Sequence, residues 1–158
     1  KLIMGNLDAK RDWGHAKEYT YAQWLILQQE VADDFCIATG EQYSVRQFID
    51  WSASKLGIKI AFAGKGIEEV GIVEDIEGSE ILGLKPGDTI VRVHERYFRP
   101  AEVDTLLGDS TKAKEVLNWT PKLSAKEVAH EMVSEDLQKA KARALLLEHG
   151  HEVNVTGD

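Results

Sequence analysis

The chain has 158 residues, 43% of them hydrophobic and 29% charged, with a formal net charge of −8 at pH 7. Such a chain is typical of one globular domain with a real core, and its negative charge argues against a nucleic-acid-binding or anionic-membrane surface. Cys36 is the only cysteine, so an internal disulfide is excluded and a reducing cytoplasm is the expected location. The sequence has no apolar run long enough to span a bilayer and no recognisable signal peptide.

Apolar residues at helical spacing and capping residues predict four helices. The predicted helices cover residues 13–29, 44–57, 109–117 and 124–145. Ser44 is the expected N-cap of the second helix, which should end at Gly57. Ser124 and Glu127 have the spacing of a capping box, which should open the long last helix. The polar sequence of residues 150–158 predicts a mobile tail.

Short apolar runs, several of them β-branched, predict strands between these helices. The runs cover residues 2–4, 35–38, 58–62 and 89–93. Between Gly64 and His94, glycines separate such runs and Pro86-Gly87-Asp88 makes a turn, which predicts a β-hairpin or small β-insertion near residues 64–94. Because strands and helices alternate along the chain, the predicted fold class is α/β.

The stretch Arg96-Tyr-Phe-Arg-Pro-Ala-Glu102 places two arginines and a glutamate around an aromatic pair and a proline. Pro100 lacks a backbone N–H and restricts the residue before it to extended conformations. We therefore expect a strand that ends at Phe98 and a rigid corner at Arg99. A helix should open at Pro100, with Glu102 in its first turn. A guanidinium held at such a corner suits a planar or anionic ligand.

Arg11 has two interpretations from the residues alone. It could hold a ligand phosphate at the N-terminus of the first helix, where the backbone N–H groups add partial positive charge. It could instead form a surface ion pair with Asp12 beside a core Trp13, and the residues alone favour this second interpretation.

Other patterns predict no catalytic centre. Gly64-Lys-Gly66 is neither a phosphate loop nor a dinucleotide fingerprint, because the residues that should follow are missing. Cys36 lies in an apolar run and no nucleophile elbow is present. The histidines do not form a metal-ligand pattern, and His130 is expected to be solvated on its helix. The core is expected to include Trp24, Trp51 and Trp119.

Six segments of the chain form an ordered series. They are GNLDAKRDWGHAKEY (5–19), the runs 24–29, 34–40 and 43–48, RYFRPAEVDTLLGD (96–109), and the run 112–121. They are spread in this order over residues 5–121 and resemble the GDP-mannose 4,6-dehydratases, a family of extended short-chain dehydrogenases. Taken singly, the Arg-Asp-aromatic motif at 11–13 and the Lys-Ala…Leu-x-Trp-x-Pro motif at 112–121 occur in many nucleotide-sugar dehydratases and epimerases. RYFRPAEVD together with GNLDAKRDWGHA is much more specific to this family.

The resemblance implies a nucleotide-sugar site. Arg11 and Arg99 would bind the diphosphate of GDP-mannose, and Glu102 would bind the adjacent ribose. Gly5 and Asn6 would line the same pocket. The chemistry agrees, because two permanent cations suit a diphosphate and a carboxylate suits vicinal hydroxyls.

The same resemblance implies what lies outside this chain. The family binds NADP through a glycine-rich βαβ loop and uses a Thr/Glu pair with a Tyr-x-x-x-Lys motif, and the sequence contains neither. Residues 1–149 would therefore be the C-terminal, substrate-binding portion of a Rossmann-type protein, with the N-terminal cofactor-binding half absent.

The family reaction converts GDP-D-mannose to GDP-4-dehydro-6-deoxy-D-mannose, on the route to GDP-fucose-type deoxyhexoses. It oxidises C4 of the mannose, eliminates water across C5 and C6 and returns the hydride at C6, so NADP is recycled. We expect the complete enzyme to be a homo-oligomer, a dimer or tetramer. This chain alone should be inactive, and it should expose apolar surface and aggregate or oligomerise.

Two alternatives stay open at this point. The chain could belong to another nucleotide-sugar epimerase or reductase with the same substrate half. The run from Leu82 to Val93 is also similar to one hairpin of PDZ domains, which would make the chain a non-catalytic peptide-binding module.

Overall fold

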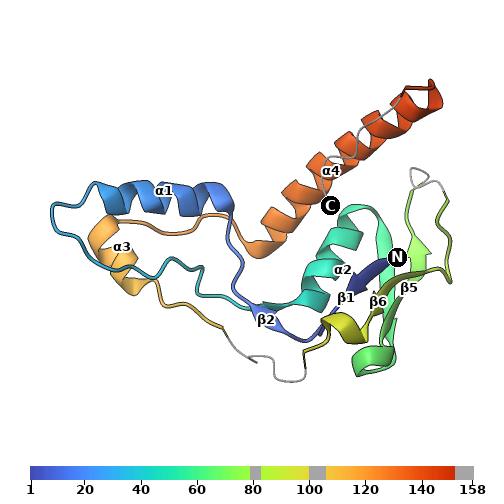
Figure 1. Ribbon diagram of the computed structural model, residues 1–158, viewed down its shortest axis with the longest axis horizontal. Helices are drawn as coiled ribbons and strands as arrows, with labels where there is room; N and C mark the ends of the chain where they lie inside the picture. The colour runs from blue at the N-terminus through green and yellow to red at the C-terminus, as the bar shows by residue number, and fades with distance from the viewer. Residues whose placement is uncertain (79–82, 100–105, 152–158) are drawn as a thin grey trace.

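The computed structural model describes residues 1–78, 83–99 and 106–151 as a mixed α/β structure (Figure 1). In chain order, its elements are β1 (Leu2–Met4), β2 (Lys10–Arg11), α1 (Ala16–Leu27), β3 (Tyr43–Ser44), α2 (Val45–Lys55), β4 (Ile58–Ala63), the 3-10 helix η1 (Gly66–Glu68), β5 (Val70–Ile76), β6 (Thr89–Val93), the 3-10 helix η2 (Glu95–Tyr97), α3 (Thr111–Leu117) and α4 (Ala125–Glu148). Across the described residues, none of the helices is both long and apolar enough to cross a bilayer.

The main sheet has four strands in the order β1-β6-β5-β4. β1 runs parallel to β6, whereas β5 pairs antiparallel with both β6 and β4. The predicted hairpin is thus confirmed as the pairing of β5 with β6, and these two strands form the centre of the sheet. A separate two-stranded sheet joins β2 to β3.

The core of the sheet lies under α2, which packs on one face. Ile49 and Ala53 of α2 are buried together with alternate residues of the strands. The buried strand residues are Ile58, Ile60, Val73, Val91 and Val93. This alternation is the pattern of a sheet that packs one face on a helix and leaves the other open.

The boundaries of α2 follow the sequence prediction. The Ser44 hydroxyl accepts a hydrogen bond from the Gln47 backbone N–H, and the Gln47 side chain accepts one from the Ser44 N–H. Gly57 follows the helix with φ of +72°, a conformation that favours glycine. A Cβ at this position would also lie 2.2 Å from the Glu77 carbonyl oxygen, so glycine is required twice over.

A second, smaller core joins α1 to α3. Ala22, Ala113, Leu117 and Trp119 are buried together. The Trp119 indole N–H donates to the Glu18 backbone carbonyl over 3.1 Å, which satisfies its only polar group. This helical part lies at the opposite end of the molecule from the sheet (Figure 1).

The last helix, α4, begins with the predicted capping box between Ser124 and Glu127. Ala125, Val128 and Ala129, all in its first turns, are its buried residues. Beyond these turns α4 projects away from the rest of the chain (Figure 1). Within the predicted tail, residues 152–158 lie outside the described residues.

The prediction of a buried strand at residues 35–38 is wrong. Within residues 28–42, all of which are described, the backbone forms no strand, and Cys36 is exposed. Phe35 and Ile37 instead pack against the α1–α3 core. Since their neighbours are helices, the segment has no strand with which to pair.

The prediction of a strand ending at Phe98 is also wrong, because β6 ends at Val93. Its neighbour β5 begins at Val70, which pairs with Arg92, so the ladder stops there. The backbone then turns into η2, where the His94 carbonyl accepts a hydrogen bond from the Phe98 N–H over 3.1 Å. The helix predicted from Pro100, with Glu102 in its first turn, lies outside the described residues.

Two side chains, one in α1 and one in α4, differ in burial from the sequence prediction. Trp24 is 53% exposed and stacks on Tyr21, because it lies on the side of α1 away from buried Ala22. His130 is only partly exposed, and its buried Nε2 has no hydrogen-bond partner among the described residues. Trp119 is buried as predicted, and Trp51 is half-buried against Tyr43.

Candidate functional site

The candidate site lies where β1 and β6 end. These neighbouring strands are parallel, with Leu2 opposite Val91 and Met4 opposite Val93. The segments that follow them therefore leave the sheet at the same edge. In open α/β sheets, ligands bind outside the carboxyl ends of the parallel strands. This edge is accordingly where the structure favours a ligand.

Gly5 holds the two outgoing segments together. The Met4 carbonyl accepts a hydrogen bond from the His94 N–H over 3.0 Å. One residue later, a Cβ on Gly5 would lie 2.3 Å from the Tyr97 carbonyl oxygen. Only glycine allows this close backbone approach. The close packing of the backbone against η2 therefore explains why position 5 is a glycine.

Asn6 shapes the turn that follows. Its Oδ1 accepts a hydrogen bond from the Asp8 N–H over 2.9 Å, an arrangement typical of asparagine in turns. Leu7 is 1% exposed and anchors the turn in the main core. The Leu7 and Ala9 carbonyls accept hydrogen bonds from the first two N–H groups of α2. The turn is therefore fixed on both sides.

Arg46, in the first turn of α2, joins this turn to β5. Its guanidinium donates two hydrogen bonds to the Glu69 carboxylate and one of 2.7 Å to Asp8. The Glu69 side chain is only 9% exposed, and the guanidinium also stacks over the Phe62 ring at 4.9 Å. The hydrogen bond to Glu69 raises the pKa of Arg46 above its ordinary value, so the cation is permanent.

Sequence reasoning missed this ionic network. An arginine in the first turn of a helix is unfavourable beside the positive end of the helix dipole, so its presence required carboxylate partners. The unfavourable position of Arg46 was the signal from which carboxylate partners could have been predicted. Glu69 and Asp8 lie 23 and 38 residues from Arg46 along the chain, and the letters do not reveal which carboxylates it meets.

Arg11 lies in β2 and is paired with Tyr43 of β3. Its Nη1 donates to the Lys10 carbonyl over 2.7 Å. The next residue, Asp12, accepts hydrogen bonds from the Thr39 N–H, the Thr39 hydroxyl and the Gly40 N–H, over 2.9, 2.6 and 2.9 Å. Asp12 therefore fixes the backbone beside Arg11 to the 39–40 loop, a contact that the sequence did not predict.

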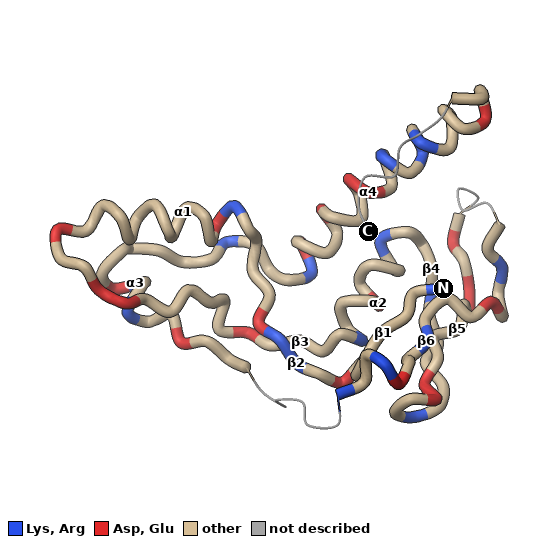
Figure 2. Tube along the Cα trace, in the orientation of Figure 1, with Lys and Arg blue, Asp and Glu red and all other residues tan. Residues whose placement is uncertain are grey.

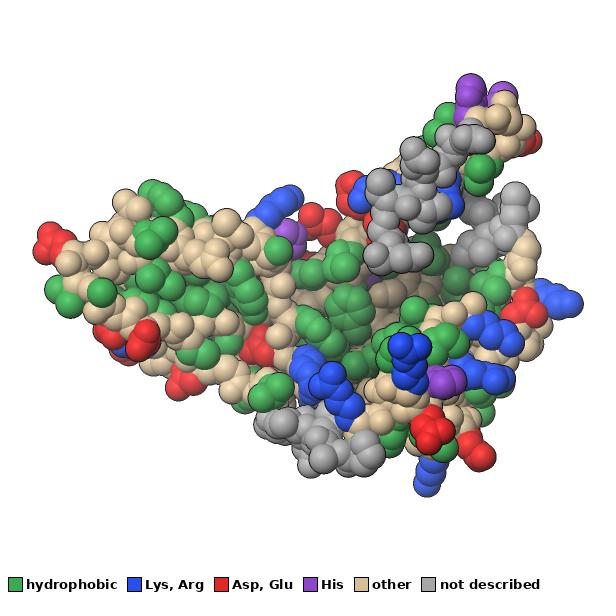
Figure 3. Space-filling model, viewed as in Figure 1, with side chains coloured by type: hydrophobic (Ala, Val, Ile, Leu, Met, Phe, Trp, Pro, Cys, Tyr) green, Lys and Arg blue, Asp and Glu red, His purple; other side chains and the backbone are tan. Residues whose placement is uncertain are grey.

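The structure brings Gly5 against Tyr97, the last residue of η2, and Arg99 follows two residues later. Arg99 is exposed, and Glu102 lies outside the described residues. Basic side chains gather on the face where β2 and the η2 segment lie (Figures 2 and 3). A group of cations at the carboxyl edge of parallel strands is suited to binding an anionic ligand.

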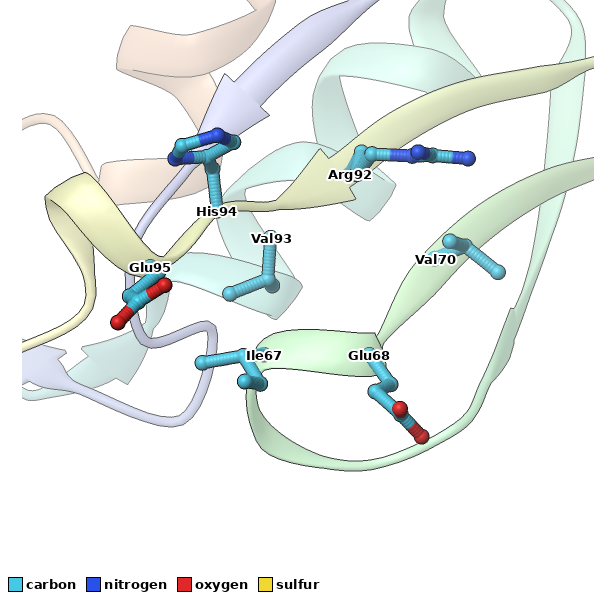
Figure 4. A pocket seen from close by; sticks show the side chains of 7 residues that line it. All are labelled: Ile67, Glu68, Val70, Arg92, Val93, His94 and Glu95. Atoms are coloured by element: carbon cyan, nitrogen blue, oxygen red, sulfur yellow. The ribbon is translucent and has the colours of Figure 1, made fainter.

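A cavity of about 430 Å³ lies beside this edge, between η1 and the end of β6. Val93 points toward Ile67 in its floor, whereas Arg92 and His94 lie on the other side of the strand (Figure 4). The His94 Nδ1 accepts a hydrogen bond from the Arg96 N–H over 3.1 Å, which fixes the turn of η2. Gly5, Asn6, Arg11 and Arg99 do not line this cavity.

The described residues do not fit a dinucleotide cofactor. Gly64 and Gly66 precede only the three-residue η1 and then β5. A dinucleotide loop instead joins a strand to a helix whose N-terminus receives the pyrophosphate. β1 leads into the Asn6 turn and β2, and so offers no such helix either.

Residues 1–132 match a family model described as GDP-mannose 4,6 dehydratase. A Vibrio cholerae protein of that name is 57% identical over 155 residues, which are 98% of this chain and 42% of the relative. A Yersinia enterocolitica protein is 52% identical over the same shares, and a Homo sapiens protein is 47% identical over 85% of this chain and 34% of its own length. The chain thus spans about two fifths of the length of the bacterial relatives.

Two solved structures share the fold. One is RMD from Pseudomonas aeruginosa complexed with NADPH, with a TM-score of 0.56 and 16% identity over 84% of this chain and 34% of that one. The other is UDP-glucose 4-epimerase from Thermotoga maritima with UDP-glucose, with a TM-score of 0.59 and 20% identity over 89% of this chain and 36% of that one. The predicted α/β fold class is confirmed, because both solved structures share this fold.

Proposed function

Because the chain belongs to the GDP-mannose 4,6-dehydratase family, we propose that it forms the part of such an enzyme that binds the nucleotide sugar. The observation that carries this proposal is the identity of 52–57% to relatives of that name over 98% of the chain. The geometry supports it, since the segments that contain Gly5, Arg11 and Arg99 leave β1 and β6 at one edge of the sheet.

In this proposal Arg11 and Arg99 bind the diphosphate of GDP-mannose. Both are permanent cations with planar donor forks, which match phosphate oxygens better than an ammonium does. Glu102 accepts hydrogen bonds from the ribose hydroxyls. Gly5 and Asn6 line the wall of the pocket, where Gly5 lets the backbone approach η2 closely.

NADP is the proposed cofactor of the whole enzyme, and residues beyond this chain would hold it. Its part in the reaction is to accept the hydride from C4 and return it at C6. This chain binds and orients GDP-mannose, so we propose that on its own it neither retains NADP nor produces GDP-4-dehydro-6-deoxy-D-mannose. The exposed thiol of Cys36 agrees with a reducing cytoplasm as the location.

Calorimetric titration of GDP into the complete enzyme tests the proposed role of Arg99. Arg99→Ala removes a charge-assisted hydrogen bond, which costs about 1.5–3 kcal/mol of binding. We expect GDP affinity to fall roughly tenfold to a hundredfold. Arg99→Lys should recover only part of the loss, because an ammonium lacks the planar fork.

Arg96→Ala is the matched control, because the Arg96 guanidinium lies over the neighbouring Tyr97 ring at 5.7 Å. We expect its GDP affinity to stay near that of the wild type. All variants are compared at one salt concentration after their melting has been checked. A folded Arg99→Ala chain that binds GDP like the wild type would contradict the proposed role.

The alternative of another nucleotide-sugar enzyme is tested by thermal protection. GDP-mannose should raise the melting temperature of the chain more than UDP-glucose does, and the opposite ranking would favour the alternative. The PDZ-like alternative requires an open sheet edge for the peptide. β6 is paired on both sides, with β1 and with β5, so no peptide strand can add there.

A further inference from the structure

The outer part of α4 is exposed and lies beyond the residues that the family model matches. The family model ends at residue 132, whereas α4 continues to Glu148. At 1.5 Å per residue, the projecting part of residues 133–148 is roughly 24 Å long. It carries exposed leucines at its end, with Leu145 57% and Leu147 53% exposed. An isolated helix of this length is marginal in water without a packing partner.

An apolar stripe runs along this projecting part. It continues the face that buries Ala125 and Ala129 in the first turns. The stripe residues alternate in steps of four and three, and they are Val133, Leu137, Ala140, Ala144 and Leu147. That spacing is typical of a helix that packs along another helix. Val133 and Leu137 are half-buried, and the stripe then becomes exposed toward the tip.

The charges of this part of α4 are segregated along the length of the helix. Residues 131–138 contain the three carboxylates Glu131, Glu135 and Asp136 and no cation, and residues 139–146 contain the three cations Lys139, Lys141 and Arg143 and no carboxylate. Figure 2 shows this change of sign along α4. The Lys139–Asp136 pair within the helix spans 3.6 Å, but both side chains are 74% exposed, so it contributes little.

A second copy of the same helix complements this surface in one orientation only. In an antiparallel pair, the acidic half of each helix lies beside the basic half of the other. With Leu137 of one copy opposite Ala140 of the other, Val133 also lies opposite Ala144, and Asp136 lies near Arg143. A parallel pair would put carboxylates beside carboxylates, which costs free energy.

We propose that residues 133–148 of α4 pair antiparallel with the same residues of a second copy of the chain. The stripe supplies the buried contact, and the segregated charges fix the direction. This interface is separate from the carboxyl edge of β1 and β6, so it leaves the candidate nucleotide site open.

Two charge variants test the proposal by sedimentation. The acidic variant carries Lys139→Glu, Lys141→Glu and Arg143→Glu, and the basic variant carries Glu135→Lys and Asp136→Lys. Each variant alone places like charges together in the pair, so its self-association should be at least about tenfold weaker than that of the wild type. An equimolar mixture of the two variants should restore the dimer.

The mixture also controls for self-association through other exposed apolar surfaces. Leu2, Ile3 and Trp24 are exposed as well, but both variants keep them unchanged, so association there would not depend on mixing. Circular dichroism checks that α4 stays helical. If each variant dimerises like the wild type, or if the mixture dimerises no better than the variants do, the proposal is wrong.

Orientation is tested by one engineered cysteine. In a Cys36→Ser background, Ala144→Cys lies opposite Val133 of the other copy, so two such chains should not form a disulfide readily. Mixing Ala144→Cys with Val133→Cys chains should give the crosslink. A fast disulfide between two Ala144→Cys chains would indicate a parallel pair and overturn the proposal.

Discussion

Replacement of Arg46 by methionine should destabilise the chain more than any loss of a surface ion pair. The Arg46 guanidinium is the hydrogen-bond partner of the Glu69 carboxylate, whose side chain is 9% exposed. Removing the cation leaves that carboxylate buried with its charge unpaired, which costs about 3–5 kcal/mol in a fully buried pair. The Arg46 side chain itself is 28% exposed, so water can partly replace it.

These figures point to the lower end of that range. Asp8 is 76% exposed, and its pair with Arg46 adds less than about 1 kcal/mol. We therefore expect Arg46→Met to cost about 3 kcal/mol of unfolding free energy. For a chain of this size that corresponds to a fall in melting temperature of roughly 6–12 °C. Replacing both partners, as Arg46→Met with Glu69→Leu, should restore most of the loss, because no charge is then left buried.

Urea unfolding followed by tryptophan fluorescence measures these changes. The matched control is Lys59→Met, since Lys59 pairs with Glu74 over 3.1 Å but both side chains are at least half exposed. The control should cost less than about 1 kcal/mol. If Arg46→Met costs no more than Lys59→Met, or if the double variant is no more stable than Arg46→Met, the buried-pair argument is refuted.

Two further changes test local features of the fold. Gly5→Ala would place a methyl group 2.3 Å from the Tyr97 carbonyl oxygen, so the segments after β1 and β6 must separate. We expect urea unfolding to show a loss of about 1–3 kcal/mol of unfolding free energy. A variant as stable as the wild type would contradict the close approach. The Ser124 hydroxyl and N–H lower the pKa of Glu127, so this carboxylate contributes stability above its unfolded-state pKa, and the contribution is lost as the pH falls through the folded-state value. Wild type should therefore lose more stability on acidification than Glu127→Gln, and identical pH profiles would contradict this. Ser124→Ala should cost about 1 kcal/mol at neutral pH, measured by the same urea assay.

Helices with local capping signals could be predicted from the sequence. Ser44 with Gln47 and Ser124 with Glu127 form hydrogen bonds between residues three apart, so the letters contain all the information required. The run at 35–38 was misjudged because an apolar strand and an apolar segment packed on helices look alike in sequence. Which neighbour such a run meets depends on distant residues.

The same dependence on distant residues explains the wrong prediction at the end of β6. Pro100 favoured an extended chain before it, but a strand requires a partner. β5 supplies partners only up to Val70 opposite Arg92, and beyond Val93 the backbone forms η2 instead. The length of a strand is thus set by its neighbour, which a local reading of the sequence does not include.

The residues of the candidate site also differ in how far the sequence could predict them. Its proposed ligand-binding residues were suggested by a resemblance, and Arg99 is the one on which the binding experiment depends. What holds the site in place was not visible in any motif. Asp12 was expected only as an ion-pair partner of Arg11, and Glu69 does not stand out from the other acidic residues of a chain of net charge −8.

Their structural roles follow from where they lie. Asp12 binds the 39–40 loop and so fixes the end of β2 at Arg11. Glu69 binds Arg46, which also binds Asp8 in the turn after Asn6. Each carboxylate thus fixes the backbone near one part of the proposed diphosphate site while its own charge is already satisfied. An anionic ligand at this edge therefore meets cations whose neighbouring carboxylates are engaged elsewhere, which is how an acidic chain can present a locally positive site.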